Sequence, residues 1–191
     1  YSLLAAHRHV FGVFFWFVAL SAMGLGPAGA VLYRMAEFGS RYWSYKSQVT
    51  GAATHDRLMN LSLKLFTWLD HVPSRMTAFG FAVVGNFEDA VDAWRRHAVL
   101  WVRPNEGTIL SAASGALGVR LGGQAAPSAD GRDVSRTLSQ GDGSDVIDAE
   151  GSTTGAPPEM AHLRSVVGLI WRSVVLWMLL LALLSLANLI G

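Results

Sequence analysis

The 191-residue sequence contains no cysteine. This absence excludes a disulfide framework, a thiol nucleophile and a cysteine-ligated metal site from these residues. Charged residues are scarce too, at 15% of the chain, against about 25% in typical globular domains. The formal net charge of +1 provides no concentrated basic surface. We therefore expect no nucleic-acid partner.

Several motifs of known chemistry are missing. The chain has no phosphate loop of the Gly-x-x-x-x-Gly-Lys-Ser/Thr type, no GxSxG and no HExxH. His7 and His9 stand two residues apart, so on a helix they point to different sides and make a poor metal pair. His71 and His97 are expected at a polar surface. The sequence therefore predicts no metal site and no evident cofactor.

The beginning of the chain also lacks a recognisable leader. It opens with Tyr1 and has neither a basic segment nor a cleavage site of the kind that a signal peptide carries. We expect the chain to be the C-terminal part of a longer polypeptide. Its missing N-terminal part is then an expected structural partner.

Long apolar segments are what the sequence does have. Residues 10–32, "VFGVFFWFVALSAMGLGPAGAVL", carry no charge and are long enough to span a bilayer. Glycines and Pro27 crowd the second half, a composition that a bundle of membrane helices tolerates. The pattern predicts a membrane span at about 10–32. The alternative is a buried core helix of a large soluble protein.

The C-terminal segment is more apolar still. Residues 173–191 contain no charge and follow Arg164 and Arg172. This pattern predicts a transmembrane helix over 164–191, with membrane lipid as its partner. Basic side chains gather between the two spans, which favours a cytoplasmic middle section and an outside C-terminus. They are Arg34, Arg41, Lys46, Arg57, Lys64, Arg75, Arg95, Arg96, Arg103 and Arg120.

Two further helices are expected in the middle section. Residues 57–69 place leucines and Trp68 at helical spacing, with polar residues on another face. This amphipathic helix either lies in the membrane interface or packs against the other membrane helices. The uncharged residues 76–87 rise about 18 Å as a helix, which is less than the bilayer core of about 30 Å. They therefore predict a partly embedded helix over about 74–101.

Polar residues after this apolar run have a structural explanation. Asn86 resembles a helix cap, and Glu88 and Asp89 follow in a first turn where the helix dipole favours negative charge. Asp92 is spaced to pair with Arg96. Catalysis by these carboxylates is the less favoured interpretation.

Two segments near the end of the middle section differ from the rest. Residues 124–160 are acidic and rich in small residues, glycine and proline, which predicts a disordered linker. Before them, the glycine-rich segment 107–123 includes "SGALGVRLGG". Glycines there let a backbone approach a ligand, and Arg120 is suited to gripping a phosphate. The alternative is a close-packed helix of small residues that ends at Gly122.

Three segments resemble the CobD/CbiB superfamily of polytopic bacterial membrane proteins. They are "GPAGAVLYRMAEF" (residues 26–38), "LDHVPSRMTAFGF" (69–81) and "GALGVRLGG" (115–123). The likeness extends over about 14–123, within a membrane region that we place at 1–123. It implies a multi-pass protein of the bacterial inner membrane.

The resemblance implies two different functions. Biosynthetic members are adenosylcobinamide-phosphate synthases, which join an aminopropanol phosphate arm to a corrin carboxylate. That function implies a corrinoid substrate, together with ATP and Mg. AmpE-like members are inner-membrane proteins linked to β-lactamase induction, which implies a regulatory partner in peptidoglycan recycling. Synthases typically carry an Asp-Asp pair where this chain has Phe66 and Thr67, and the stretch 69–96 is similar to the AmpE-like pattern.

We therefore expect an all-α polytopic membrane protein with amphipathic helices and an acidic linker, closest to the AmpE-like branch. The alternatives are a synthase, with Asp70 as a weak candidate base, and a structural membrane subunit. The resemblance offers as ligand- or phosphate-binding candidates Arg75, Gly118, Arg120, Gly122 and Gly123. The structural positions of the shared motifs are Pro27, Tyr33, Arg34 and Pro73.

Overall fold

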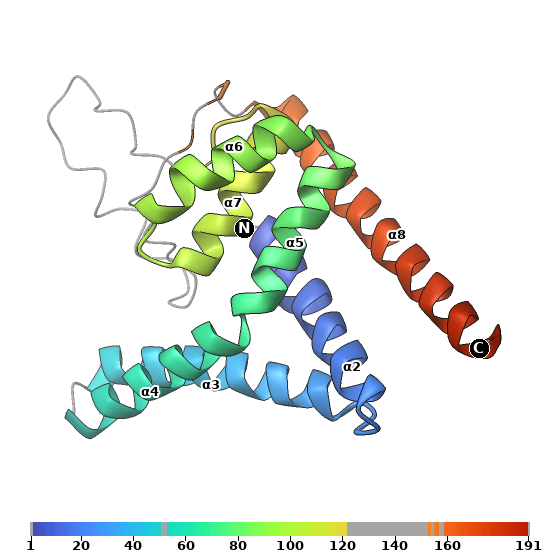
Figure 1. Ribbon diagram of the computed structural model, residues 1–191. Helices are drawn as coiled ribbons and strands as arrows, with labels where there is room; N and C mark the ends of the chain where they lie inside the picture. Colours follow the sequence, from blue (N-terminus) through green and yellow to red (C-terminus); the bar gives the residue numbers. More distant parts are fainter. Residues whose placement is uncertain (1, 51–52, 122–152, 154, 157–158, 191) are drawn as a thin grey trace, which may run out of the picture.

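The computed structural model describes residues 2–50, 53–121, 153, 155–156, 159 and 160–190 (Figure 1). These residues form helices and their connections, with one isolated backbone pairing between Val119 and Ala156. The expected all-α class is therefore confirmed. The predicted linker at 124–160 lies largely outside the described residues.

The first helical stretch runs without interruption through α1 (Ser2–Ala6), a π-helical segment (His7–Phe11) and α2 (Gly12–Ala22). Its 21 residues are apolar enough to cross a membrane, and at 1.5 Å per residue they reach about 30 Å. The prediction of one span over 10–32 is wrong. Gly24 and Gly26 adopt positive φ angles, which end the helix and turn the chain. The exposed Pro27 then precedes the next helix.

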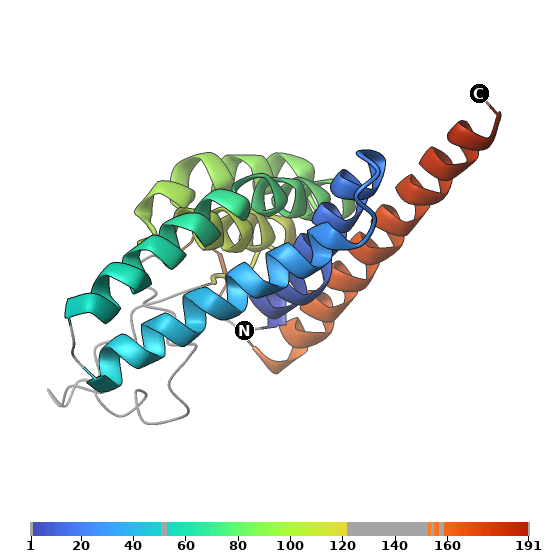
Figure 2. The ribbon, with the colours of Figure 1, turned by 90° about the horizontal axis from the view of Figure 1, so that it is seen from below.

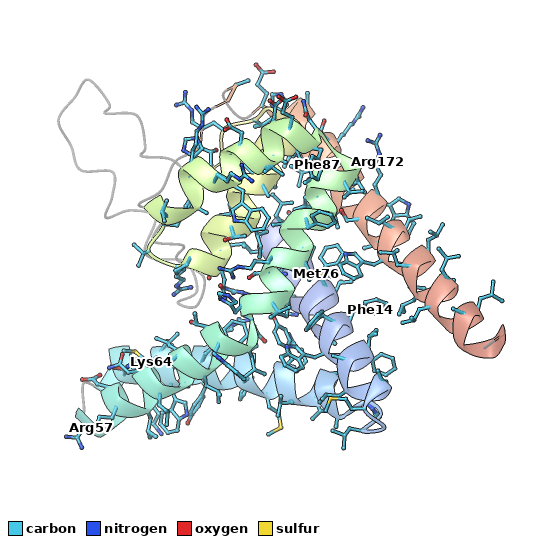
Figure 3. The ribbon with its side chains drawn as sticks, viewed as in Figure 1. Phe14, Arg57, Lys64, Met76, Phe87 and Arg172 are labelled. Carbon is cyan, nitrogen blue, oxygen red and sulfur yellow. The ribbon has the colours of Figure 1, made fainter. Side chains whose placement is uncertain are left out.

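The turn sends α3 (Ala28–Thr50) back along α2, and α4 (Ala53–Leu69) then returns along α3 (Figures 1 and 2). A side chain at Gly29 would strike the backbone carbonyl of Trp16, so glycine permits the close approach of α2 and α3. The predicted amphipathic helix at 57–69 is the C-terminal part of α4. Figure 3 shows Arg57 and Lys64 on the part of α4 that, together with α3, extends away from the remaining helices.

Helices α3 and α4 expose many large apolar side chains. Trp68, the residue expected at headgroup depth, is 74% exposed. Exposed apolar patches larger than those of ordinary soluble proteins mark a lipid or protein contact surface. Helix α4 packs against α3 and still exposes an apolar surface. The exposed residues are Val31, Leu32, Met35, Phe38, Tyr42, Tyr45 and Val49 on α3, and Leu58, Leu61, Leu65 and Trp68 on α4.

The predicted helix at 74–101 is divided in two. Helix α5 (His71–Val84) ends at Gly85, and α6 (Phe87–His97) begins after Asn86. The side chain of Asn86 accepts a hydrogen bond from the Asp89 amide at 3.3 Å, so the expected cap is confirmed. This cap starts a new helix and explains the division. In Figure 3, Phe14 on α2 and Met76 on α5 mark where these two helices meet.

Helix α7 (Pro104–Leu117) lies beside α6 and carries much of the buried core. A side chain at Gly115 would strike the backbone of Asp89 and Ala90 on α6. The helix ends at Gly118, which has a φ of 66°. The predicted glycine-rich segment is thus a close-packed helix, but it ends before Gly122. The buried apolar cluster contains Leu3, Leu4, Phe11, Phe81, Trp101, Ile109, Leu110, Ala113, Val166 and Leu169.

Helix α8 (Met160–Ile190) contains the second segment apolar enough to span a membrane, and its C-terminal half projects from the bundle (Figure 1). Of the residues in its most apolar part, 11% are buried inside the bundle, against 28% for the first stretch. A core helix of a soluble protein is mostly buried, and these two are not. The structure therefore agrees with a membrane protein whose outer surface contacts apolar surroundings.

Candidate functional site

A buried carboxylate lies where four helical segments meet. Asp70, at the start of α5, is 5% exposed. Its Oδ1 accepts hydrogen bonds from the Tyr33 hydroxyl at 2.7 Å and from Nε2 of His7 at 2.8 Å. Its Oδ2 is 3.4 Å from Nδ2 of Asn105 on α7. Burial of an ionised carboxyl is costly, and these donors stabilise its negative charge.

The second nitrogen of the His7 ring extends the site to α5. Nδ1 lies 2.9 Å from the hydroxyl oxygen of Thr77. In the neutral ring whose Nε2 donates to Asp70, Nδ1 accepts and the Thr77 hydroxyl donates to it. We call these five side chains, His7, Tyr33, Asp70, Thr77 and Asn105, the Asp70 network.

Local backbone geometry positions each member. His7 opens the π-helical segment, and such segments are rare and occur frequently at functional sites. Asn105 lies in the first turn of α7, after the exposed Pro104. Its amide also donates to the Thr67 carbonyl at 2.9 Å, which ties α7 to the end of α4. The network therefore fixes the relative positions of segments far apart in the sequence.

The buried ring of Tyr33 occupies space that the absence of a side chain at Gly12 provides. Its ring is fully buried and lies against Gly12, where a side chain would overlap it. On another side it contacts the ring of Phe66, with centroids 5.6 Å apart. Burial, and next the negative charge of Asp70, raise the pKa of Tyr33 far above its usual range. The hydroxyl therefore stays protonated and remains a donor to Asp70.

The donor order of Asp70, His7 and Thr77 is the order of a carboxylate–imidazole–hydroxyl triad. Thr77, however, is 1% exposed. A substrate cannot reach its hydroxyl in this arrangement. The geometry therefore suits positioning and charge stabilisation better than nucleophilic attack.

Two groups of charges border the Asp70 network. In the first, Glu37 on α3 binds Arg34 through Oε2 at 2.9 Å and Arg41 through Oε1 at 3.2 Å. In the second, Oε1 of Glu106 binds Arg8 at 2.7 Å and Arg103 at 3.0 Å. We call them the Glu37 triad and the Glu106 triad. Each places two guanidinium groups around one carboxylate.

The site brings together some of the residues singled out from the sequence. Asp70 is at its centre, Tyr33 is its direct partner, and Arg34 belongs to the Glu37 triad. Pro73 is buried in the first turn of α5, beside the network. Pro27 lies apart from it, in the turn before α3.

Three of the predicted phosphate-binding residues, Arg75, Gly118 and Arg120, are described by the structure, and they occupy separate surroundings. Arg75 donates to the His71 carbonyl of its own helix at 2.9 Å. Arg120 is exposed, and its amide donates to Ala156. Gly118 stands thirteen residues from Asn105, about 20 Å along α7. Gly122 and Gly123 lie outside the described residues. Among the described residues, the structure thus shows no contact that joins Arg75 to Gly118 or Arg120.

Sequence reasoning missed several members of the site. Nothing in the local sequence of Thr77 or Asn105 marks them as partners of Asp70. His7 and His9 were judged only as a possible metal pair, for which their spacing is poor. The actual partner of His7 is Asp70, 63 positions away. The Arg-x-x-Glu-x-x-x-Arg spacing of the Glu37 triad was the one available signal, because such spacing places the three side chains on one helix face.

The carboxylates of the site do not suit a Mg²⁺ ion. Mg²⁺ is bound by carboxylate oxygens and water in near-octahedral geometry. The carboxylate oxygens of Asp70, Glu37 and Glu106 instead face hydrogen-bond donors of the protein. Around Glu37 and Glu106 these donors are cationic guanidinium groups. Among the residues that the structure describes, no group of three His, Asp or Glu is placed to hold a metal ion.

Comparisons with known proteins agree on one family. A family model described as CobD/Cbib protein matches residues 6–149. The cobalamin biosynthesis protein CobD of Stutzerimonas stutzeri is 30% identical over 173 residues, which cover 90% of this chain and 48% of that protein. The protein of the same name from Chromobacterium violaceum is 36% identical over 121 residues, covering 61% and 34%. The chain thus spans about half or less of these relatives' lengths. No solved structure matches.

Proposed function

The chain belongs to the CobD/CbiB family, and on that premise we propose that it acts in cobalamin biosynthesis. The proposed role is that of an adenosylcobinamide-phosphate synthase, which joins aminopropanol phosphate to a corrin carboxylate. One observation carries this choice: both relatives named above are cobalamin biosynthesis proteins, and the family match contains every residue of the Asp70 network.

The proposed reaction forms an amide bond. The amine nitrogen attacks the carboxyl carbon, a carbon–oxygen bond breaks, and the amine loses a proton. A carboxylate is a poor acceptor for an amine, so a nucleoside triphosphate must first activate it as an acyl phosphate, with phosphate as the leaving group. The residues of this chain serve the reaction by binding and orienting the substrates.

Asp70 is a positioning residue in this proposal. Its carboxylate is shielded from solvent and engaged by three donors, so it is poorly placed to take a proton from an amine. It holds Tyr33 and His7 in place, and through them the π-helical segment and α3. The charged groups on these two elements then keep the arrangement that a bound substrate requires.

A regulatory, AmpE-like role is the second candidate. It was the main expectation from the sequence, and the names of the relatives give it no support. One observation still favours it. Where synthases carry paired carboxylates, Phe66 packs against Tyr33, and Thr67 is exposed. If the chain has this role, Asp70 has a purely structural task.

We further propose a multi-pass location in the bacterial inner membrane. Two helices of spanning length and the exposed apolar surface of α3 and α4 support a membrane environment. The corrinoid and the aminopropanol phosphate are the proposed ligands. A preceding N-terminal part of the same polypeptide is the proposed structural partner.

Genetic complementation tests the proposed function. The full-length gene is supplied to a bacterium that lacks its synthase, and growth is made dependent on cobalamin formed from cobyric acid. We expect rescue by the wild-type gene, loss of rescue with Asp70→Leu, and normal rescue with Asp92→Leu at the exposed surface of α6. Absence of rescue, with wild-type protein present in the membrane fraction, would favour the regulatory role.

A further inference from the structure

Two stretches of chain that residues 122–152 connect lie side by side after the end of α7. The Arg120 amide donates to the Ala156 carbonyl at 2.9 Å, and the Ala156 amide donates to the Gly118 carbonyl at 3.0 Å. These bonds form the parallel pairing between Val119 and Ala156. The pairing therefore joins the turn that ends α7 to the segment that leads into α8.

Thr153 is the buried centre of this contact, with 4% of its surface exposed. Its amide donates to the Leu121 carbonyl at 3.2 Å, and its hydroxyl oxygen accepts a hydrogen bond from the Leu121 amide at 2.8 Å. The same oxygen lies 2.6 Å from the hydroxyl oxygen of Ser114, which donates to the Val119 carbonyl at 2.8 Å. One side chain thus connects the last turns of α7 with the strand-like residues that follow.

Gly155 permits the close approach of the two stretches. Its φ of 147° lies in the region that favours glycine. A side-chain carbon there would lie 2.7 Å from the Arg120 amide nitrogen. The stretches therefore match in shape as well as in hydrogen bonds. We call Gly118, Val119, Arg120 and Leu121 the docking edge, and Thr153, Gly155 and Ala156 the docked segment.

The docking edge belongs to the glycine-rich string that suggested a phosphate site. Its Arg120 and Leu121 amides donate to the docked segment. A phosphate held by backbone amides would need these same N–H groups. The described part of the string therefore binds a segment of its own chain.

The docked segment stands next to the start of α8. Ala156 precedes Met160, where α8 begins, by four residues, which span at most about 14 Å. Further along α8, Val166 and Leu169 are buried in the apolar cluster that contains Phe81 of α5. Helix α8 is thus held at two places, by hydrogen bonds before its start and by apolar packing along its first half.

We propose that the docking edge is an intramolecular receptor for the docked segment, and that it holds α8 on the bundle without the covalent connection through residues 122–152. A tether between two binding partners contributes effective concentration and no contact of its own. The hydrogen bonds and the packing remain when the tether is cut. The inference goes beyond the proposed function and does not depend on it, because the same contacts hold α8 in a synthase or in a regulatory protein.

Cleavage of the connection in the assembled protein tests this proposal. A specific protease site is inserted between residues 136 and 137 of the full-length protein, which carries an affinity tag at its N-terminus. The protein is cut in mild detergent and bound through the tag, and the C-terminal fragment that remains is measured over time during washing. We expect the wild-type fragment to stay bound. In the cut protein, the Arg120 and Ala156 amides should still exchange their hydrogens slowly.

Thr153→Val should shorten the half-time of fragment release at least about tenfold, because it removes the buried acceptor of the Leu121 amide. Thr153→Ser keeps the hydroxyl and should release the fragment nearly as slowly as the wild type. Thr67→Val, at an exposed position on α4, is the matched control and should behave as the wild type.

Gly155→Ala should also speed release, since its added carbon would meet the Arg120 amide. Gly24→Ala is its matched control. Gly24 has a positive φ too, but nothing lies within 4 Å of its added carbon. It therefore carries the conformational cost without touching the docking edge. Every variant is cut only after it elutes as the wild type does in size-exclusion chromatography, so faster release reports lost docking and not failed folding.

Loss of the wild-type fragment as soon as the connection is cut would overturn the proposal. Equal half-times for the wild type, Thr153→Val and Gly155→Ala would also overturn it, because apolar packing alone would then hold α8. Rapid exchange of the Arg120 and Ala156 amides in the uncut wild type would contradict the pairing itself.

Discussion

The two ends of helix α7 are built in opposite ways. At its start, Asn105 joins a network of polar side chains that come from three other helical segments. At its end, Gly115 lies against the backbone of α6, and Gly118 turns the chain with a positive φ. One end is held by directional hydrogen bonds and the other by close contact of backbones. The conspicuous glycines thus mark packing, whereas the polar chemistry lies about 20 Å away.

This difference shows which features of the chain a sequence motif can identify and which it cannot. The glycine string is contiguous and easily recognised, but its described part serves a helix end. The Asp70 network is assembled from single residues on separate helices, and no continuous motif announces it. The following variants probe whether the two ends fail in different ways.

Asp70→Leu should have the largest effect. It removes the acceptor of the Tyr33 and His7 donors, and each buried donor left without a partner costs about 1–3 kcal/mol. We expect the free energy of unfolding of the full chain in mild detergent to fall by about 3 kcal/mol or more. Denaturant titration measures the change. Asp92→Leu, at an exposed pair with Arg96, is the control and should change stability little. Equal effects of the two variants would show that the network contributes no more to the free energy of unfolding than an exposed ion pair does.

Gly115→Ala should come next, at the opposite end of α7. The added methyl group meets the Ala90 Cα at 2.6 Å, so α6 and α7 must move apart. Overpacking of this kind costs about 1–3 kcal/mol. Gly168→Ala on α8 is the matched control because nothing lies within 4 Å of its added carbon. A destabilised Gly168→Ala with an unaffected Gly115→Ala would reverse the packing argument.

Helix types and several boundaries follow from local signals. The sequence predicted the Asn86 cap, the amphipathic residues of α4 and the apolar residues of α8. Such features are predictable because capping and periodicity act within a few residues. The division of residues 10–32 into two helices was missed, since length and lack of charge outweighed Gly24 and Gly26. The partners of Asp70 were not predictable. Sequence separations of 35 to 63 residues carry no local pattern.

Tyr33→Phe is a smaller change in the Asp70 network, at the start of α7. The change removes one hydroxyl and leaves Asp70 with its other donors, so we expect a loss of about 1.5–2 kcal/mol. Tyr45→Phe, at an exposed position on the same helix, should be nearly neutral.

The loss should not vary below about pH 10, the usual pKa of tyrosine. Because the pKa of Tyr33 is raised in the folded protein, its contribution is complete below the unfolded pKa and declines only as pH rises above it. Denaturant titrations at pH 6 and pH 9 check this. A loss that disappears between these values would contradict a protonated donor at this position.

Gly118→Ala should have the smallest effect and sharpens the contrast at the glycine end. The residue has a φ of 66°, and nothing lies within 4 Å of an added carbon, so the cost is conformational alone. We expect a loss of about 1 kcal/mol for alanine in the left-handed region. Gly118→Asn should lose less, since asparagine tolerates that region better. If alanine cost nothing, or if phosphate affinity fell while stability held, Gly118 would belong to a ligand site rather than to a helix end.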